Sequence, residues 1–106
     1  MTTAWALSQE GFETAIVKLG VDVPTRINTF HPDVLILDIS QPGLNGKMIA
    51  RLLRESWPEL PILVAGLRNG DDGPMPARTE MLAKPFSIDA LVDAIVRLVY
   101  APSSDL

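Results

Sequence analysis

Two continuous apolar runs, at residues 34–39 and 61–65, dominate the hydrophobic pattern of the chain. Uninterrupted runs of Val, Ile and Leu are typical of parallel strands that are covered on both faces of a sheet. The sequence therefore predicts two buried strands, with Asp38 at the C-terminal end of the first. A shorter run at residues 80–83 predicts a third strand, which ends at Lys84.

Helical spacing of apolar residues predicts helices between and after these strands. After a loop at residues 42–46, apolar residues recur at positions 48, 49, 52 and 53 until Trp57-Pro58 closes the helix. A last helix, capped by Ser87, carries apolar residues at positions 91, 92, 95, 98 and 99. Between these parts, Gly and Pro residues in segment 68–78 disfavour a regular helix.

The N-terminal part has a weaker pattern. Residues 12–18 predict a strand, and residues 21–30 predict a short helix with Pro24 near its start. Strands that alternate with helices favour a parallel α/β sheet. We expect one domain at residues 1–100, followed by a polar tail at residues 101–106.

Composition narrows the classes of function. The chain has 106 residues, 47% of them apolar, which is enough to build one domain with a core. Its net charge of −4 disfavours direct binding to nucleic acid or to an anionic membrane, because phosphates are bound by clustered Lys and Arg. Without cysteine, and with one histidine, a metal site would need oxygen ligands. No apolar run approaches the ~20 residues of a membrane span, so we expect a cytoplasmic protein.

In an open α/β sheet, ligands bind outside the carboxyl ends of the strands, where Asp38, Gly66 and Lys84 are all predicted to lie. With these residues the chain resembles the receiver domain of bacterial two-component response regulators. The resemblance rests on Pro-Asp-Val-Leu-Ile-Leu-Asp at residues 32–38, Pro-Gly-Leu-Asn-Gly at 42–46 and Leu-Ala-Lys-Pro-Phe at 82–86. It extends upstream through Gly11-Phe12 and Gly20, and so covers nearly the whole chain.

The resemblance implies a flavodoxin-like parallel sheet with helices on both faces. It implies that Asp38 is a phosphoacceptor, whose carboxylate attacks a phosphohistidine on a sensor histidine kinase and becomes an acyl phosphate. Lys84 would contact a phosphoryl oxygen, and Mg²⁺ would neutralise charge during transfer. The plainer alternatives are a loop or helix-capping carboxylate at Asp38 and a solvated lysine at Lys84.

The sequence departs from the family at the metal site. The family supplies an acidic pair after its first strand, but two overlapping βαβ units before Asp38 would need roughly 50 residues, and 37 precede it. We therefore expect residues 3–10 to end the first helix and the acidic pair to lie outside the chain. Forcing residues 2–7 into the first strand, with Gln9 and Glu10 as the pair, would make the next helix and strand too short. With the acidic pair outside the chain, we expect magnesium to bind weakly, through Asp38 and the backbone carbonyl of Ser40 alone.

Two further departures concern signalling. Gly66 stands where the family has a Thr or Ser hydroxyl that bonds the phosphoryl group, and Met81 stands where the family has an aromatic switch residue. These changes leave two functions open. One is a receiver that is phosphorylated on Asp38, and the other is a degenerate receiver that binds a protein partner without phosphorylation. An aspartyl phosphatase is set aside, because its second Asp would fall on Ser40.

Loss of the family's first strand would leave open sheet edges, because this strand lies between the segments at 12–18 and 34–39. We expect either that these two segments pair directly or that a second copy of the chain completes the sheet, with a weak preference for the dimer.

Other candidate residues receive structural interpretations. His31 is expected at an exposed helix end, and Asp71 and Asp72 in a solvated turn. Trp5 and Trp57 are expected to pack beside helix ends, so neither is assigned a function.

Overall fold

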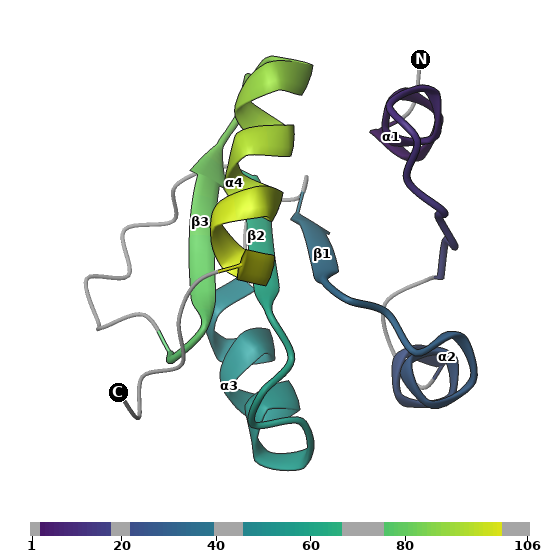
Figure 1. The fold of residues 1–106 in the computed structure, drawn as a ribbon. Coiled ribbons are helices and arrows are strands. Elements are labelled where there is room, and N and C mark those ends of the chain that lie inside the picture. Colours follow the sequence, from purple (N-terminus) through teal and green to yellow (C-terminus); the bar gives the residue numbers. More distant parts are fainter. Residues whose placement is uncertain (1–2, 18–21, 40–45, 67–75, 101–106) are drawn as a thin grey trace. The chain divides into compact units, whose positions relative to one another are not determined.

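The computed structural model describes residues 3–17, 22–39, 46–66 and 76–100. The chain divides into two compact units, Met1–Pro32 and Asp33–Leu106. Figure 1 shows the helices and strands of both. Predicted features at Ser40, at the loop 42–45, at Asp71 and Asp72 and in the tail 101–106 lie outside the described residues.

The described residues of the first unit form two helices, α1 (Thr3–Gln9) and α2 (Asp22–Phe30). Helix α2 was predicted, and it buries Val23 and Ile27, which are one helical turn apart. It ends as expected at His31, which adopts a left-handed backbone conformation with φ of 56°. The amide of His31 donates to the carbonyl of Ile27 at 3.1 Å, so this residue closes the last turn of α2.

The predicted strand at residues 12–18 is wrong over its described part, because residues 12–17 form no strand. A strand is stable only when its backbone groups pair with a neighbouring strand. The described elements of this unit are helices, which offer no such partner. The expected direct pairing of this segment with the first sheet strand is therefore also absent from the described sheet.

The second unit contains a parallel sheet of three strands in the order β1 (Leu35–Ile39), β2 (Ile62–Gly66) and β3 (Thr79–Ala83). All three strands were predicted to within one residue at each end. Strand β2 is central, and all five of its residues are buried. A central parallel strand has neighbours on both sides and helices on both faces, which explains why its sequence is continuously apolar.

Helix α3 (Gly46–Ser56) covers one face of this sheet. The core on this side consists of Leu37, Ala50, Ile62 and Val64. Strand register explains the set, because Leu37 pairs with Val64 and Leu35 with Ile62, so alternate residues of β1 and β2 share this face. Of the four apolar positions predicted along α3, Ile49 and Leu53 pack against this core, whereas Met48 and Leu52 are exposed.

Helix α4 (Ile88–Tyr100) covers the opposite face. Its side chain Arg97 contacts Glu80 of β3, and Glu80 is in register with Leu63, which belongs to the face of β2 turned away from α3. The helix begins as predicted, because the Ser87 hydroxyl accepts a hydrogen bond from the amide of Ala90 at 3.0 Å. Its buried residues are Leu91, Ala94, Ile95 and Leu98.

No helix in the described part of the chain is both long and apolar enough to cross a membrane.

Candidate functional site

The carboxyl end of the sheet brings together the three strand-end residues that the sequence predicted. Asp38 is the fourth residue of β1, Gly66 ends β2, and Lys84 directly follows β3. The backbone fixes their positions, because Gly66 is in register with Ala83 and its carbonyl accepts a hydrogen bond from the amide of Lys84 at 3.2 Å. The three residues therefore lie together at the carboxyl end of the sheet.

The ammonium group of Lys84 donates to Oδ1 of Asp38 and forms an ion pair with it. This contact joins β1 to the end of β3 across the central strand. The residue of β2 in register with Asp38 is Ala65. The Lys84 side chain is 29% exposed and the Asp38 side chain 52% exposed, so the carboxylate is open to a reactant while it is held by the lysine.

This geometry suits a carboxylate nucleophile. An exposed carboxylate at a strand end can be approached from solvent, and a fixed ammonium beside it can stabilise negative charge on an incoming oxyanion. The Lys84 ammonium is bonded to Asp38 while its side chain stays 29% exposed.

The other predicted site residues occupy different positions. Met81 lies within β3, in register with Val64, and is half-buried. Gly66 has no side chain, so it supplies no hydroxyl donor at this end of the sheet. Ser40 lies outside the described residues.

Asp38, the carboxylate that the sequence predicted as a Mg²⁺ ligand, lies at this end of the sheet. No group of three or more His, Asp or Glu side chains is placed to hold a metal in the described part of the chain. Mg²⁺ prefers octahedral oxygen ligands and is usually bound by one or two carboxylates with waters and substrate phosphates. Asp38 supplies one carboxylate, and one of its oxygens already accepts from Lys84.

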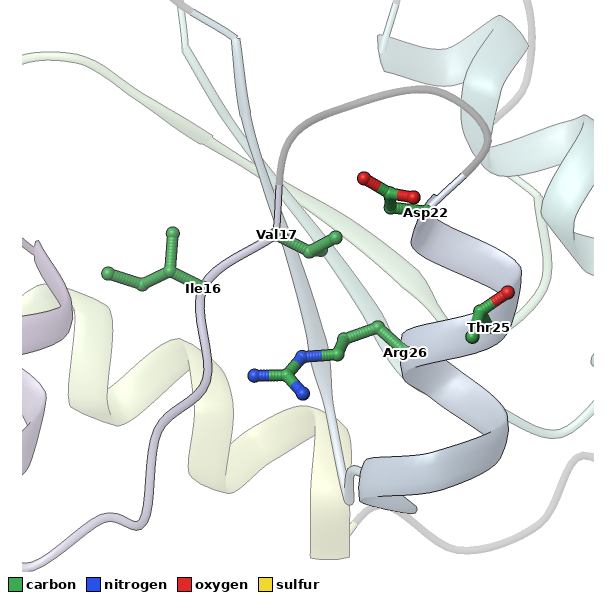
Figure 2. A pocket seen from close by; sticks show the side chains of 5 residues that line it. All are labelled: Ile16, Val17, Asp22, Thr25 and Arg26. Atoms are coloured by element: carbon green, nitrogen blue, oxygen red, sulfur yellow. The ribbon is translucent and has the colours of Figure 1, made fainter.

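A second feature lies wholly within the first unit. A hollow of about 520 Å³ is lined by Ile16 and Val17, on the segment before α2, and by Asp22, Thr25 and Arg26 of the helix itself. Figure 2 shows these five side chains. Ile16 is 73% exposed, so the hollow is open to solvent. The charged groups that line it are the carboxylate of Asp22 and the guanidinium of Arg26. None of its lining residues belongs to the group of Asp38, Gly66 and Lys84.

Residues 1–96 match the family described as the response regulator receiver domain. The chain belongs to this family. It is therefore a receiver module of two-component signal transduction, in agreement with the resemblance seen in its sequence. Its three-stranded parallel sheet with a helix on each face is the corresponding part of the flavodoxin-like receiver fold.

Curated relatives and solved structures agree with the receiver assignment. The DNA-binding transcriptional regulator NtrC of Proteus hauseri is 29% identical over 89% of this chain and 21% of its own length. Response regulator MprA of Mycobacterium leprae is 31% identical over 94% of this chain and 46% of its own length. This receiver chain thus spans less than half the length of these curated relatives.

Among solved structures, the apo receiver domain of nitrogen regulatory protein C matches with a TM-score of 0.72 and 27% identity. That match covers 91% of this receiver and 81% of the other chain. The signal receiver domain of a response regulator from Bermanella marisrubri matches with a TM-score of 0.67 and 31% identity, over 90% of this chain and 83% of the other.

Sequence reasoning missed a second polar cluster at the opposite end of the receiver sheet, which is centred on Arg54. The guanidinium of Arg54 contacts residues up to 25 positions away along the chain. The only local signal was a basic residue in the last turn of a helix, which more often interacts with nearby helix carbonyls.

Proposed function

We propose that this receiver accepts a phosphoryl group on Asp38 from the phosphohistidine of a sensor histidine kinase. A carboxylate oxygen of Asp38 attacks the phosphorus, an O–P bond forms, the N–P bond breaks, and the histidine leaves with the bonding electron pair. The observation that supports this assignment is the Asp38–Lys84 pair at the exposed edge of the sheet.

Lys84 has an electrostatic role in this proposal. Its ammonium holds the Asp38 carboxylate in one orientation and can transfer a hydrogen bond to a phosphoryl oxygen once the acyl phosphate forms. Lysine suits this exchange of partners, because it is a compact charge with three donors on a flexible stem. The two roles use the same atom, so removal of Lys84 weakens both orientation and charge stabilisation.

Gly66 and Met81 alter how the phosphorylated state is transmitted. Without a hydroxyl at Gly66, the phosphoryl group loses one donor that receivers of this family use. Without an aromatic ring at Met81, the signal passes through the contacts of Lys84 and β3 rather than through an aromatic switch. We propose that phosphorylation here moves the Lys84 ammonium from Oδ1 of Asp38 to an oxygen of the attached phosphoryl group.

Magnesium assists the proposed reaction, although this chain would hold it weakly. Mg²⁺ neutralises phosphoryl charge in transfer reactions, and here Asp38 with the Ser40 carbonyl would bind it weakly. The described residues contain no group of three or more His, Asp or Glu side chains that could hold it.

The remaining properties follow from the same proposal. The phosphoryl group stays on the chain as a signal, so the receiver is a signalling module rather than an enzyme. Residues 1–100 would form the receiver and residues 101–106 a polar tail.

The partner of the receiver is a histidine kinase. The receiver makes no direct contact with nucleic acid or membrane, and it can form a homodimer. We place it in the cytoplasm, because a relative is described as a DNA-binding transcriptional regulator.

The test is the intact mass of the purified chain after incubation with acetyl phosphate, with and without Mg²⁺. We expect a gain of one phosphoryl group, with acetate as the leaving group. Asp38→Asn should abolish it, because the amide is not a nucleophile of comparable strength. Weak metal binding predicts that labelling needs Mg²⁺ concentrations well above those that saturate a two-carboxylate site.

Two outcomes would contradict the proposal. Labelling that persists in Asp38→Asn would place the phosphoacceptor elsewhere. A complete lack of labelling, with the chain shown to be folded by circular dichroism, would favour a receiver that binds its partner without phosphorylation.

A further inference from the structure

Arg54, in the last turn of α3, joins three elements through one guanidinium group. Its Nη1 donates to the carbonyls of Trp57 at 2.7 Å and Leu60 at 2.5 Å. Its Nη2 donates to the carbonyl of Arg78 at 3.2 Å and to the hydroxyl of Thr79 at 3.0 Å. The fork geometry of a guanidinium allows such a set of contacts, whereas a lysine ammonium cannot span it.

These acceptors mark where the two neighbouring strands begin. Leu60 lies two residues before β2, and Thr79 is the first residue of β3. Arg78 adopts a left-handed conformation with φ of 53°, and its carbonyl also accepts from the amide of Ile62 at 3.0 Å. One guanidinium therefore fixes the starts of β2 and β3 against the end of α3.

We propose that Arg54 is a positioning residue for the phosphoacceptor site, because it sets where β3 begins on β2 and so where Lys84 ends up beside Asp38. Strand β3 has five residues and is at the edge of the described sheet, bonded to β2 alone. A slip that preserves its faces moves it by two residues, about 6.6 Å at the usual strand rise. Such a shift would carry the Lys84 ammonium out of reach of Asp38.

Geometry rather than charge explains the choice of arginine. All four acceptors of Arg54 are neutral oxygens. Burial, followed by the charge of Arg78, lowers the pKa of Arg54, whereas Glu59 raises it. Glu59 pairs instead with Arg78 at 3.7 Å. A cation held by neutral acceptors contributes through its hydrogen-bond directions, so a lysine should not replace it.

The inference rests on the proposed phosphorylation, but its main test does not. The amide of Lys84, bonded to the Gly66 carbonyl, reports whether β3 ends in the right place. In Arg54→Met and Arg54→Lys, hydrogen exchange at Lys84 should accelerate roughly tenfold more than exchange at Val64 of the central strand. The ¹³C resonance of the Asp38 carboxylate, which Lys84→Met should shift in the parent chain, should no longer respond to Lys84→Met in the Arg54→Met background.

Arg97→Met is the matched control, because it removes another arginine that contacts β3, through one exposed ion pair with Glu80. It should leave both readouts unchanged. If the chain is labelled by acetyl phosphate, Arg54→Met should slow labelling by up to ~100-fold, the size expected for a misplaced catalytic group.

Equal acceleration of exchange at Lys84 and Val64 would overturn the inference, because Arg54 would then support only global stability. Rescue of both readouts by Arg54→Lys would also overturn it. If the parent chain takes no label, the proposed function fails, and the exchange and resonance measurements still decide the role of Arg54.

Discussion

Two arginines reach adjacent residues of β3 from opposite faces of the sheet. Arg54 of α3 contacts Thr79 and three backbone carbonyls, and its guanidinium is partly buried. Arg97 of α4 contacts Glu80 through one carboxylate oxygen at 2.5 Å, with its side chain 58% exposed. Of these two arginines, only Arg97 has a charged acceptor, the carboxylate of Glu80. Arg54 nevertheless makes more hydrogen bonds and connects more segments of the chain.

The difference teaches that the two faces are held in different ways. The hydrogen bond to Glu80 raises the pKa of Arg97, but water and salt screen such an exposed pair. The α4 face is instead held by the buried apolar residues of α4, which are Leu91, Ala94, Ile95 and Leu98. On the α3 face, apolar packing is supplemented by directed hydrogen bonds at the strand starts. Four substitutions separate these contributions.

The largest effect is expected from Leu91→Ala, which tests the apolar hold of α4. Leu91 is 1% exposed, so truncation removes buried area and leaves a cavity. We expect the free energy of unfolding to fall by about 2–5 kcal/mol. Urea unfolding followed by circular dichroism measures this free energy. A loss below ~1 kcal/mol would contradict the conclusion that apolar packing holds α4 on the sheet.

Arg54→Met should have the next largest effect on stability. The change keeps most of the apolar stem but leaves the carbonyls of Trp57, Leu60 and Arg78 without this donor. Hydrogen bonds to charged groups are worth about 1.5–3 kcal/mol, and we expect a loss of that size. A loss within error of zero in urea unfolding would remove the distinction between the two arginines.

Ser87→Ala tests the start of α4 independently of Arg97. The Ser87 hydroxyl satisfies the amide of Ala90, which is one of the unpaired donors at the helix N-terminus. We expect a loss of roughly 1 kcal/mol. Ser87→Asn, which keeps a capping acceptor, should restore most of it, and failure of that rescue would argue against a capping role.

Arg97→Met should have the smallest effect. The Arg97 side chain is 58% exposed and the Glu80 side chain 33% exposed, so water offsets much of the attraction in this ion pair. We expect no measurable change in the urea midpoint at physiological salt. A clear loss that disappears at high salt would show that this pair contributes more than its exposure suggests.

How much the sequence could predict differs between the two units. Each described strand of the second unit was predicted, because a buried parallel strand needs a continuous apolar run, as at residues 62–66. The segment 12–17 also carries apolar residues, but a strand needs a partner that one segment cannot specify. Helix α3 shows a similar limit, because one segment does not specify which of its apolar residues another element will cover. Four apolar positions were predicted along it, and two of them, Met48 and Leu52, are exposed.

The candidate site divides in a similar way. The sequence by itself determined that Asp38, Gly66 and Lys84 lie at strand ends, since parallel strands place their carboxyl ends at one edge. It also determined the missing hydroxyl at Gly66 and the Ser87 cap. These are local properties of residue type and spacing.

Only the tertiary structure decided which groups touch. It paired Lys84 with Asp38, 46 positions away, and it brought Arg54 to Arg78 and Thr79. Both contacts cross from one element to another, so they depend on the register of β3 against β2. That register follows from the summed packing and hydrogen bonding of several elements, and no single segment of sequence encodes it.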